Sequence, residues 1–365
     1  MHILVGDIGG THTRLALAQL SSQSPGRPKV DLAPAGGGSG FIEPGAQRPR
    51  SQVRLQQVTR YHNRDYPDLN TILAEYLADK AACTLCCLAV AGPTDGRSVQ
   101  FTNLAWQIEV AALSARFGFS RCQLINDFAS VGWGLNTLTP DALATLQAGQ
   151  PAAGGARGAA VALGAGTGLG VSLCAWRDDH YQPLASEGGH VGFAPVNSEQ
   201  DRLLNFLRTL HGRVSVERIL SGPGLVDLFR FCLAEAGQRA ASPLLDAAHP
   251  AAAISQSGLE RSDPAAMHCL RLFAEIYGQT AGDWALAAQT RGGIFLAGGI
   301  APKLLPVLNS GAFLDGFNAK GRYSGWMRQV PVAVILDPDI GLKGAAFAAT
   351  HAATLAAAGA KAQSE

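Results

Sequence analysis

The residues best suited to chemistry form a short turn near the start of the chain, where an aspartate lies among glycines. Residues 3–18 read ILVGDIGGTHTRLALA, which predicts an apolar strand, a turn over 6–11 and a second, alternating strand. Glycines allow several backbone N–H groups to approach one anion, because no Cβ stands in the way. Asp7 inside the turn would repel phosphate unless a cation lay between them. The turn therefore indicates a Mg²⁺–nucleotide site, with an ordinary glycine hairpin as the alternative.

A second glycine turn repeats this arrangement later in the chain. Residues 161–163 are an apolar run, residues 164–170 read GAGTGLG, and alternating apolar residues follow. Neither turn has the lysine of a Walker A loop or the spacing of a dinucleotide fingerprint. The pair indicates two matching hairpins of a duplicated fold, while sheet glycines at bulges are the simpler alternative.

Two polar residues follow directly after another predicted strand. Asn126 and Asp127 stand between the run 121–125 and a predicted helix over 129–135. In open sheets with parallel strands, ligands collect at the carboxyl ends of the strands. Asn126 and Asp127 are therefore candidates for substrate contacts, and equally for capping that helix, which both residue types commonly do.

Further polar groups lie in three later segments. The loop 186–191 carries Glu187 and His190, which could serve a metal ion, a pair of sugar hydroxyls or only each other, and two ligands are too few to indicate zinc. Glu217 lies in a predicted short helix over 214–220. Gly298 and Gly299 follow the predicted strand 293–297 and precede a helix expected from residue 302, where a nucleotide could approach the helix N-terminus.

The elements that must position these groups alternate between strands and helices. Strands are predicted over 53–58, 85–90, 121–125, 293–297 and 332–336, and helices over 66–80, 110–117, 129–135, 201–211, 225–235, 265–289 and from 344 onward. Segments 21–52, 140–158 and 238–263 lack periodicity, so we expect connectors there, with 21–52 as a surface loop.

Composition excludes several classes of protein. The 365 residues suffice for two domains, and 47% apolar with 16% charged residues is typical of a globular chain. A net charge of +1 gives no reason to expect nucleic acid or an acidic membrane as partner, and the uncharged segment 158–176 has too many glycines for a membrane helix. Cys83, Cys86 and Cys87 lie in an apolar run, which favours a buried strand over half a zinc site or a redox pair. With no secretory signal, the chain is expected to be cytoplasmic.

Six segments, in order and with compatible spacing, resemble the bacterial glucokinase family: LVGDIGGTHTRLALA, LINDFASV, LGAGTGLGVSL, EGGHVGFAP, RVSVERILSGPGL and FLAGGIAPK. The resemblance implies an α/β, two-domain, actin-like (ribonuclease H-like) sugar kinase fold with a cleft between the domains. We expect a small domain of residues 1–137 plus 336–365, which contains the surface loop 21–52, and a large domain of residues 138–335.

The resemblance also implies a role for each matched residue. Asp127 would be the general base that takes the proton from the 6-hydroxyl of glucose, and the other hydroxyls would be bound by Asn126, Glu187, His190 and Glu217. ATP and Mg²⁺ are the implied cofactors, with Asp7 acting on the magnesium through water. The nucleotide would be bound by Gly6, Asp7, Ile8, Gly9, Gly10, Thr11, Gly164, Gly166, Thr167, Gly168, Gly298 and Gly299. Partners are expected to be these small molecules, and a homodimer stays an open option.

The sequence departs from the family pattern at three places. His12 stands where asparagine is usual, the loop 21–52 is longer than the usual turn, and Gly192 replaces a common aspartate. None of these is an expected sugar ligand, so the departures concern nucleotide affinity more than the reaction. Two alternatives stay open: a kinase for another hexose or phosphoryl donor, and a sugar-binding regulator without activity. Asp127 argues against the regulator, as does the first hairpin at residue 3, where a repressor would place a helix-turn-helix.

Overall fold

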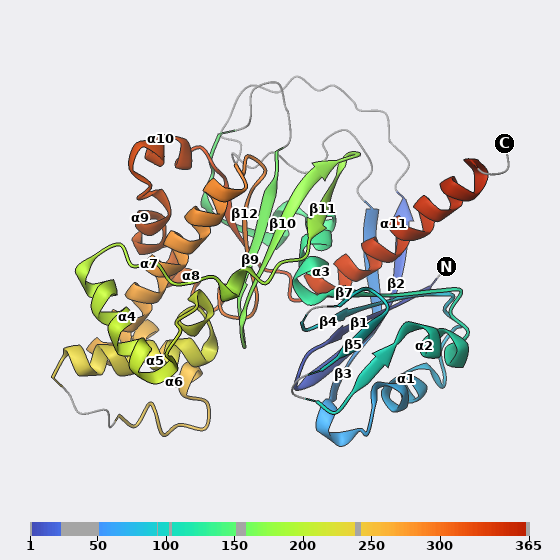
Figure 1. Ribbon diagram of the computed structural model, residues 1–365, viewed down its shortest axis with the longest axis horizontal. Helices are drawn as coiled ribbons and strands as arrows, with labels where there is room; N and C mark the ends of the chain where they lie inside the picture. The colour runs from blue at the N-terminus through green and yellow to red at the C-terminus, as the bar shows by residue number, and fades with distance from the viewer. Residues whose placement is uncertain are drawn as a thin grey trace.

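Two mixed β-sheets form the framework of the molecule, and helices pack on each of them (Figure 1). The computed structural model describes residues 2–22, 51–92, 94–101, 104–150, 158–237 and 242–362. Most of the expected surface loop 21–52 therefore lies outside the described residues. Its described ends are not loop, because they belong to two paired strands.

The first sheet consists, in spatial order, of β3 (Ser51–His62), β2 (His12–Ser22), β1 (Ile3–Ile8), β4 (Leu85–Val90) and β7 (Arg121–Asn126). Side chains alternate between its two faces. Leu4 and Leu15 pack with α1 (Leu69–Leu77) and α2 (Val110–Phe117), whereas Val5 packs with the terminal helix α11 (Ile340–Ala362). A small hairpin of β5 (Ser98–Gln100) and β6 (Gln107–Glu109) adjoins α2.

The second sheet has the order β11 (His180–Leu184), β10 (Leu169–Arg177), β9 (Ala160–Ala165), β12 (Gly293–Ala297), β13 (Val332–Ile335) and β8 (Leu143–Gln147). The long helix α7 (Pro264–Ala287) is buried along much of its length and packs with this sheet. The other helices of this part are α4 (Ser198–His211), α5 (Gly222–Glu235), α6 (Pro250–Leu259), α8 (Leu305–Leu308), α9 (Ala312–Asn318) and α10 (Ser324–Met327).

Each sheet contains an antiparallel hairpin whose first strand also pairs with a parallel strand. β1 lies between β2 and β4, and β9 lies between β10 and β12. The predicted repeat of two hairpins is therefore confirmed. Because β1, β4 and β7 are parallel, the turn after β1 and the first residue after β7, Asp127, lie at the same edge of the first sheet.

The helix α3 (Asp127–Gly134) lies between the two sheets, against α11 (Figure 1). The two helices cross closely, since a Cβ on Gly344 would lie 1.7 Å from Ser130 O and one on Gly134 would lie 2.6 Å from Ile340 O. On its other side α3 meets the second sheet, where a Cβ on Gly132 would lie 2.7 Å from Pro183 Cβ. The helix α3 is thus held by contacts to both parts of the molecule.

Several predicted boundaries are wrong. Gly6, Asp7 and Ile8 belong to β1 and Gly164 to β9, because neighbouring strands on both sides hold these residues extended, and Gly170 belongs to β10, where it pairs with Gly164. The segment 140–158 contains β8, an edge strand that pairs with β13, and the segment 238–263 contains α6. No helix begins at residue 302; turns occupy 298–304 and α8 follows.

Two composition-based expectations can be compared with the structure. Cys83, Cys86 and Cys87 are buried at or within β4, which confirms the buried-strand interpretation. The uncharged segment 158–176 forms β9 and most of β10. None of the helices in the described residues has the length and apolar character needed to cross a bilayer.

Candidate active site

Asn126 and Asp127 join β7 to α3. Asn126 is the N-cap of α3: its Oδ1 accepts the N–H groups of Phe128 and Ala129, each at 3.0 Å. The capping interpretation therefore holds for Asn126, which keeps its amide nitrogen for other contacts, with Gly92 O 3.4 Å away. Asp127 is the first residue of the helix, and its Oδ1 accepts the N–H of Phe128 at 2.8 Å.

The negative charge of the ionised Asp127 carboxylate is poorly compensated by its surroundings. Its pKa is raised to about 6, mainly by burial and also by the nearby carboxylates of Asp7 and Glu187, while the N–H of Phe128 acts in the opposite direction. Ionised above this value, the carboxylate is a stronger proton acceptor than an ordinary aspartate. A base with a pKa near the working pH is the most effective in proton transfer.

Phe128, beside this aspartate, is held by the hairpin of the second sheet. Gly164 and Gly170 are opposite one another in the β9–β10 register. A Cβ on Gly164 would lie 2.4 Å from Phe128 Cζ, and one on Gly170 would lie 1.8 Å from Phe128 Cδ2. These glycines therefore leave space for an aromatic ring, and Phe128 is a positioning residue that the sequence reasoning missed.

Three residues from two separate segments form a polar cluster, which we call the loop cluster: Glu187 and His190 from the loop after β11, and Glu217 from a short 3₁₀ turn. His190 Nε2 lies 4.0 Å from Glu187 Oε2, and His190 Nδ1 lies 3.9 Å from Glu217 Oε1. Glu217 Oε2 accepts the N–H of Leu169 at 2.8 Å. Since Glu187 also acts electrostatically on Asp127, the structure brings the predicted sugar ligands and the predicted base to one place.

The turn after β1 is supported by a residue that the sequence reasoning did not single out, Asn63. Its Nδ2 donates to Gly9 O at 2.8 Å, its backbone N–H donates to Thr11 O at 2.9 Å, and its Oδ1 accepts from Thr13 Oγ1 at 2.8 Å. Within the turn, the N–H of Gly9 donates to His12 O. Among the described residues, the N–H groups of Gly10 and Thr11 have no acceptor.

The turn after β9 offers a similar pair of donors. Gly166 N–H donates to Gly168 O at 2.8 Å, whereas the N–H groups of Thr167 and Gly168 find no acceptor in the part of the chain that the structure describes. Gly298 lies against the end of β9: its φ is +80°, and a Cβ there would lie 2.5 Å from Ala165 O. The structure thus places Gly298 and the exposed Gly299 beside this turn.

Asp7 lies on β1 opposite Arg14. Burial raises the pKa of Asp7 and Arg14 lowers it, but Arg14 is itself paired with Asp339 and with Pro338 O. No group of three or more His, Cys, Asp or Glu side chains in the described ranges could hold a metal ion. One acidic oxygen donor fits Mg²⁺, which keeps most of its waters and takes other ligands from substrate phosphates.

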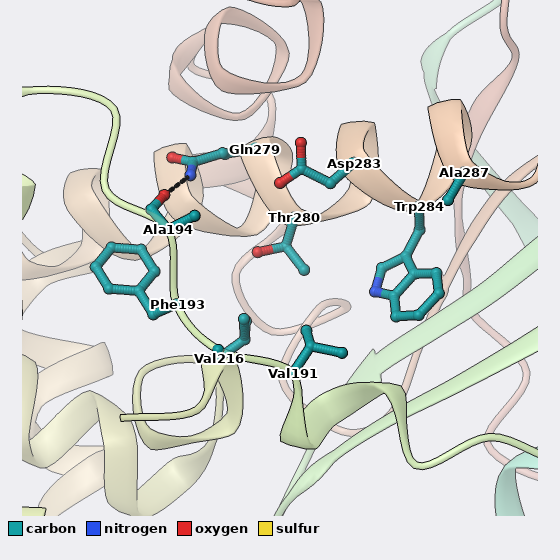
Figure 2. A pocket seen from close by; sticks show the side chains of 10 residues that line it. Val191, Phe193, Ala194, Val216, Gln279, Thr280, Asp283, Trp284 and Ala287 are labelled. Carbon is teal, nitrogen blue, oxygen red and sulfur yellow. Dashed lines mark hydrogen bonds between the residues drawn. The ribbon is translucent and has the colours of Figure 1, made fainter. Parts of the chain in front are cut away.

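A cavity of about 180 Å³ lies beside the loop cluster, between residues 191–194 and α7 (Figure 2). Gln279 Nε2 donates to Ala194 O at 2.6 Å, and a Cβ on Gly188 would lie 2.6 Å from Trp284 Cζ2. The helix α7 therefore supports the loop from behind. Asp127 and the loop cluster do not line this cavity, so it adjoins the site and is not the site itself.

Comparison with known proteins identifies the family. The model of the Glucokinase family matches residues 40–352. The glucokinase of Caulobacter vibrioides (strain NA1000 / CB15N) is 38% identical, with 95% of each chain covered, and that of Nostoc punctiforme is 36% identical over 96% of this chain and 99% of its own. A glucokinase structure from an Antarctic psychrotroph, 30% identical, covers 96% of this chain and 99% of its own with a TM-score of 0.77. The predicted actin-like sugar kinase fold is thereby confirmed, and the chain belongs to the glucokinase family of ATP-dependent hexose kinases.

Proposed function

We propose that the protein transfers the γ-phosphoryl group of ATP to the 6-hydroxyl of D-glucose, giving glucose 6-phosphate and ADP, with Asp127 as the general base. The observation that carries this assignment is the carboxyl group of Asp127, fixed at a strand end beside Glu187 with its pKa raised to about 6. Such a group is ionised at neutral pH and still basic enough to accept a hydroxyl proton.

The loop cluster and Asn126 bind the sugar in this proposal. Carboxylates accept hydrogen bonds from hydroxyl groups, and the amide of Asn126 and the imidazole of His190 add donors. A site built to pair each hydroxyl rejects a sugar in which one is missing or inverted, because its own polar groups would be left unpaired. Glu217 also connects the sugar to the donor, since the same carboxylate holds the N–H of Leu169 next to the second turn.

The donor's phosphates are bound by the turn tips. Of the predicted contacts, Gly10, Thr11, Thr167 and Gly168 have N–H groups without an acceptor in the described ranges, whereas Gly6, Ile8 and Gly164 support the site from within strands. Gly298 and Gly299 lie against the adenosine. A magnesium ion held through water by Asp7 would neutralise part of the charge on the triphosphate.

The reaction forms one bond and breaks another. The 6-oxygen of glucose attacks the γ-phosphorus, the bond from that phosphorus to the bridging oxygen of ADP breaks, and the hydroxyl proton passes to Asp127. Residues 1–137 with 336–365 and residues 138–335 act as two domains that close on the sugar and exclude water. We place the reaction in the cytoplasm, where seven free cysteines stay reduced; a homodimer stays a prediction.

The test is Asp127→Asn in an assay of sugar 6-phosphate formation, with glucose, mannose and glucosamine as acceptors and ATP, ADP and polyphosphate as donors. We expect glucose with ATP to be the preferred pair, and Asp127→Asn to lower kcat by about 10²- to 10⁴-fold. Asp79→Asn, an exposed acid after α1, is the matched control and should keep normal activity. Turnover of Asp127→Asn near the wild-type rate would refute the assignment of the base.

A further inference from the structure

Four basic side chains share one face of the first sheet with Asp7. In the strand register Asp7 is opposite Arg14, Arg14 is opposite Arg60, and His12 is opposite His62. Cross-strand partners point to the same face, as do residues two apart on one strand. The row therefore runs from Asp7, beside the first turn, to the end of β3 at the edge of the sheet.

The end of β3 is also tied to the turn itself. Asn63 directly follows His62, and it holds Gly9, Thr11 and Thr13 through the three hydrogen bonds already described. A side chain at Arg60 or His62 is therefore placed relative to the free N–H groups of the turn by a short, hydrogen-bonded path. The end of β3 therefore lies next to the region proposed to bind the phosphoryl donor, as the end of β1 does.

The charges in this row are unevenly compensated. Arg14 is paired with Asp339. Arg60 is exposed, and no acidic side chain within the described ranges pairs with it. The rings of His12 and His62 contact edge to face, with centroids 4.8 Å apart. His62 Nδ1 is buried without a hydrogen-bond partner among the described residues. An unpaired guanidinium beside two imidazoles is a local surplus of hydrogen-bond donors.

We propose that Arg60, His12 and His62 form a cationic subsite for the phosphate chain of the donor, next to the free N–H groups of the turn. The subsite rests on the proposed function, because it extends the donor site of that reaction. A phosphate chain supplies the acceptor oxygens and negative charge that this row lacks, and arginine binds phosphate through two parallel hydrogen bonds. His12 then contacts the phosphoryl donor, at the position where the family usually has asparagine.

Binding of the donor's phosphate chain should change the protonation of His12. Desolvation lowers the pKa of His12, and the charges of Arg60 and His62 lower it further, so the free protein disfavours the charged form of this imidazole. The groups facing it are Asp7 on β1, Arg14 on its own strand, Arg60 and His62 on β3, and Asp339 before α11. A bound polyphosphate adds negative charge there and raises the affinity of the imidazole for a proton. Donor binding should therefore take up a proton.

The experiment compares Arg60→Gln and His12→Asn with Arg54→Gln, a control on the same strand whose side chain lies on the opposite face. KM for ATP should rise about three- to fivefold in Arg60→Gln, as expected for one exposed charge contact, while kcat, KM for glucose and thermal stability stay unchanged. The inhibition constant of inorganic tripolyphosphate should rise by the same factor, whereas that of adenosine should not change. Arg54→Gln should match the wild type in every measurement.

Calorimetry of the non-hydrolysable analogue AMPPNP provides a test that needs no turnover. Titrations in two buffers of different ionisation enthalpy should show proton uptake by the wild type and its loss in His12→Asn. Unchanged affinity for AMPPNP and tripolyphosphate in both variants would overturn the subsite even if the enzyme is active. An inactive wild-type protein that binds AMPPNP with proton uptake would refute the proposed function and leave the subsite standing, and a protein that does not bind AMPPNP would refute both.

Discussion

Asp127 is expected to reduce the stability of the fold that it serves, and Asp127→Asn tests this directly. The asparagine keeps the size of the side chain, and its Oδ1 still accepts the N–H of Phe128. It removes only the charge, which is half-buried and faces the carboxylates of Asp7 and Glu187. The same substitution that lowers kcat should therefore make the protein more stable.

The size of the gain follows from the pKa of Asp127. The rise from 3.8 to about 6, at 1.36 kcal/mol per unit, makes the ionised carboxylate cost about 3 kcal/mol in the folded state. A carboxylate in the first turn of a helix contributes about 0.3–1 kcal/mol in the opposite direction, so the net gain is about 2 kcal/mol. The cost is complete above the folded pKa of about 6, shrinks as the pH falls through it, and vanishes below the unfolded value.

The assay is urea unfolding of wild type and Asp127→Asn, followed by circular dichroism across a pH series. The variant should be more stable by about 2 kcal/mol at neutral pH and by about half as much near pH 5. Asp79→Asn, which lies in solvent beside Lys80, should show no such gain. Equal or lower stability of Asp127→Asn at neutral pH, or a gain that does not change with pH, would show that the carboxylate is not under electrostatic strain.

Three further outcomes are expected. Because Asp127 must be ionised to accept a proton, kcat/KM for glucose should rise with pH and level off above about pH 6; a steady-state pH series checks this, and an activity that falls across the same range would contradict it. Gly170→Ala should lower the free energy of unfolding by about 1–3 kcal/mol and also lower kcat, since the new Cβ displaces Phe128. Urea unfolding and steady-state kinetics measure the two effects, and a normal kcat would contradict the positioning role of Phe128. Gly192→Ala should stabilise the protein by about 0.4–1 kcal/mol and leave activity unchanged, because a Cβ there meets nothing within 4 Å; a lowered melting temperature would contradict this.

The parts of the site that depend on local sequence could be predicted. An apolar run before each glycine turn and period-two alternation after it predicted both hairpins, and the polar pair after an apolar run predicted the end of β7. The exact ends of the strands could not be predicted. β1 continues through Gly6 and Asp7 because β2 and β4 pair with it on both sides, and this pairing outweighs the weak strand propensity of both residues.

Contacts between distant segments could not be predicted either. Asn63 supports a turn about fifty residues before it, and nothing near residue 63 in the sequence indicates that partner. β8 is a short edge strand of mixed composition whose partner, β13, is far along the chain. In α6 Ile254 is a fully buried residue among alanines, serines and one glutamine, so the helix has little apolar periodicity to detect.

The contacts of α3 indicate where the two halves of the molecule can pivot. The first residue of α3, Asp127, directly follows a strand of the first sheet. The second residue, Phe128, places its ring against Gly164 and Gly170 of the second sheet. At the other end of α3, Gly134 contacts Ile340 at the start of α11, where the chain returns to the first sheet. If the two proposed domains close on the sugar, a rotation that preserves these close contacts would have its axis near α3. Asp127 then moves little, whereas the turn after β1 and the end of β3 move more because they lie farther from the axis. We therefore expect closure to bring the donor's phosphates toward a base that is already in position, so that sugar can bind before the donor site is complete.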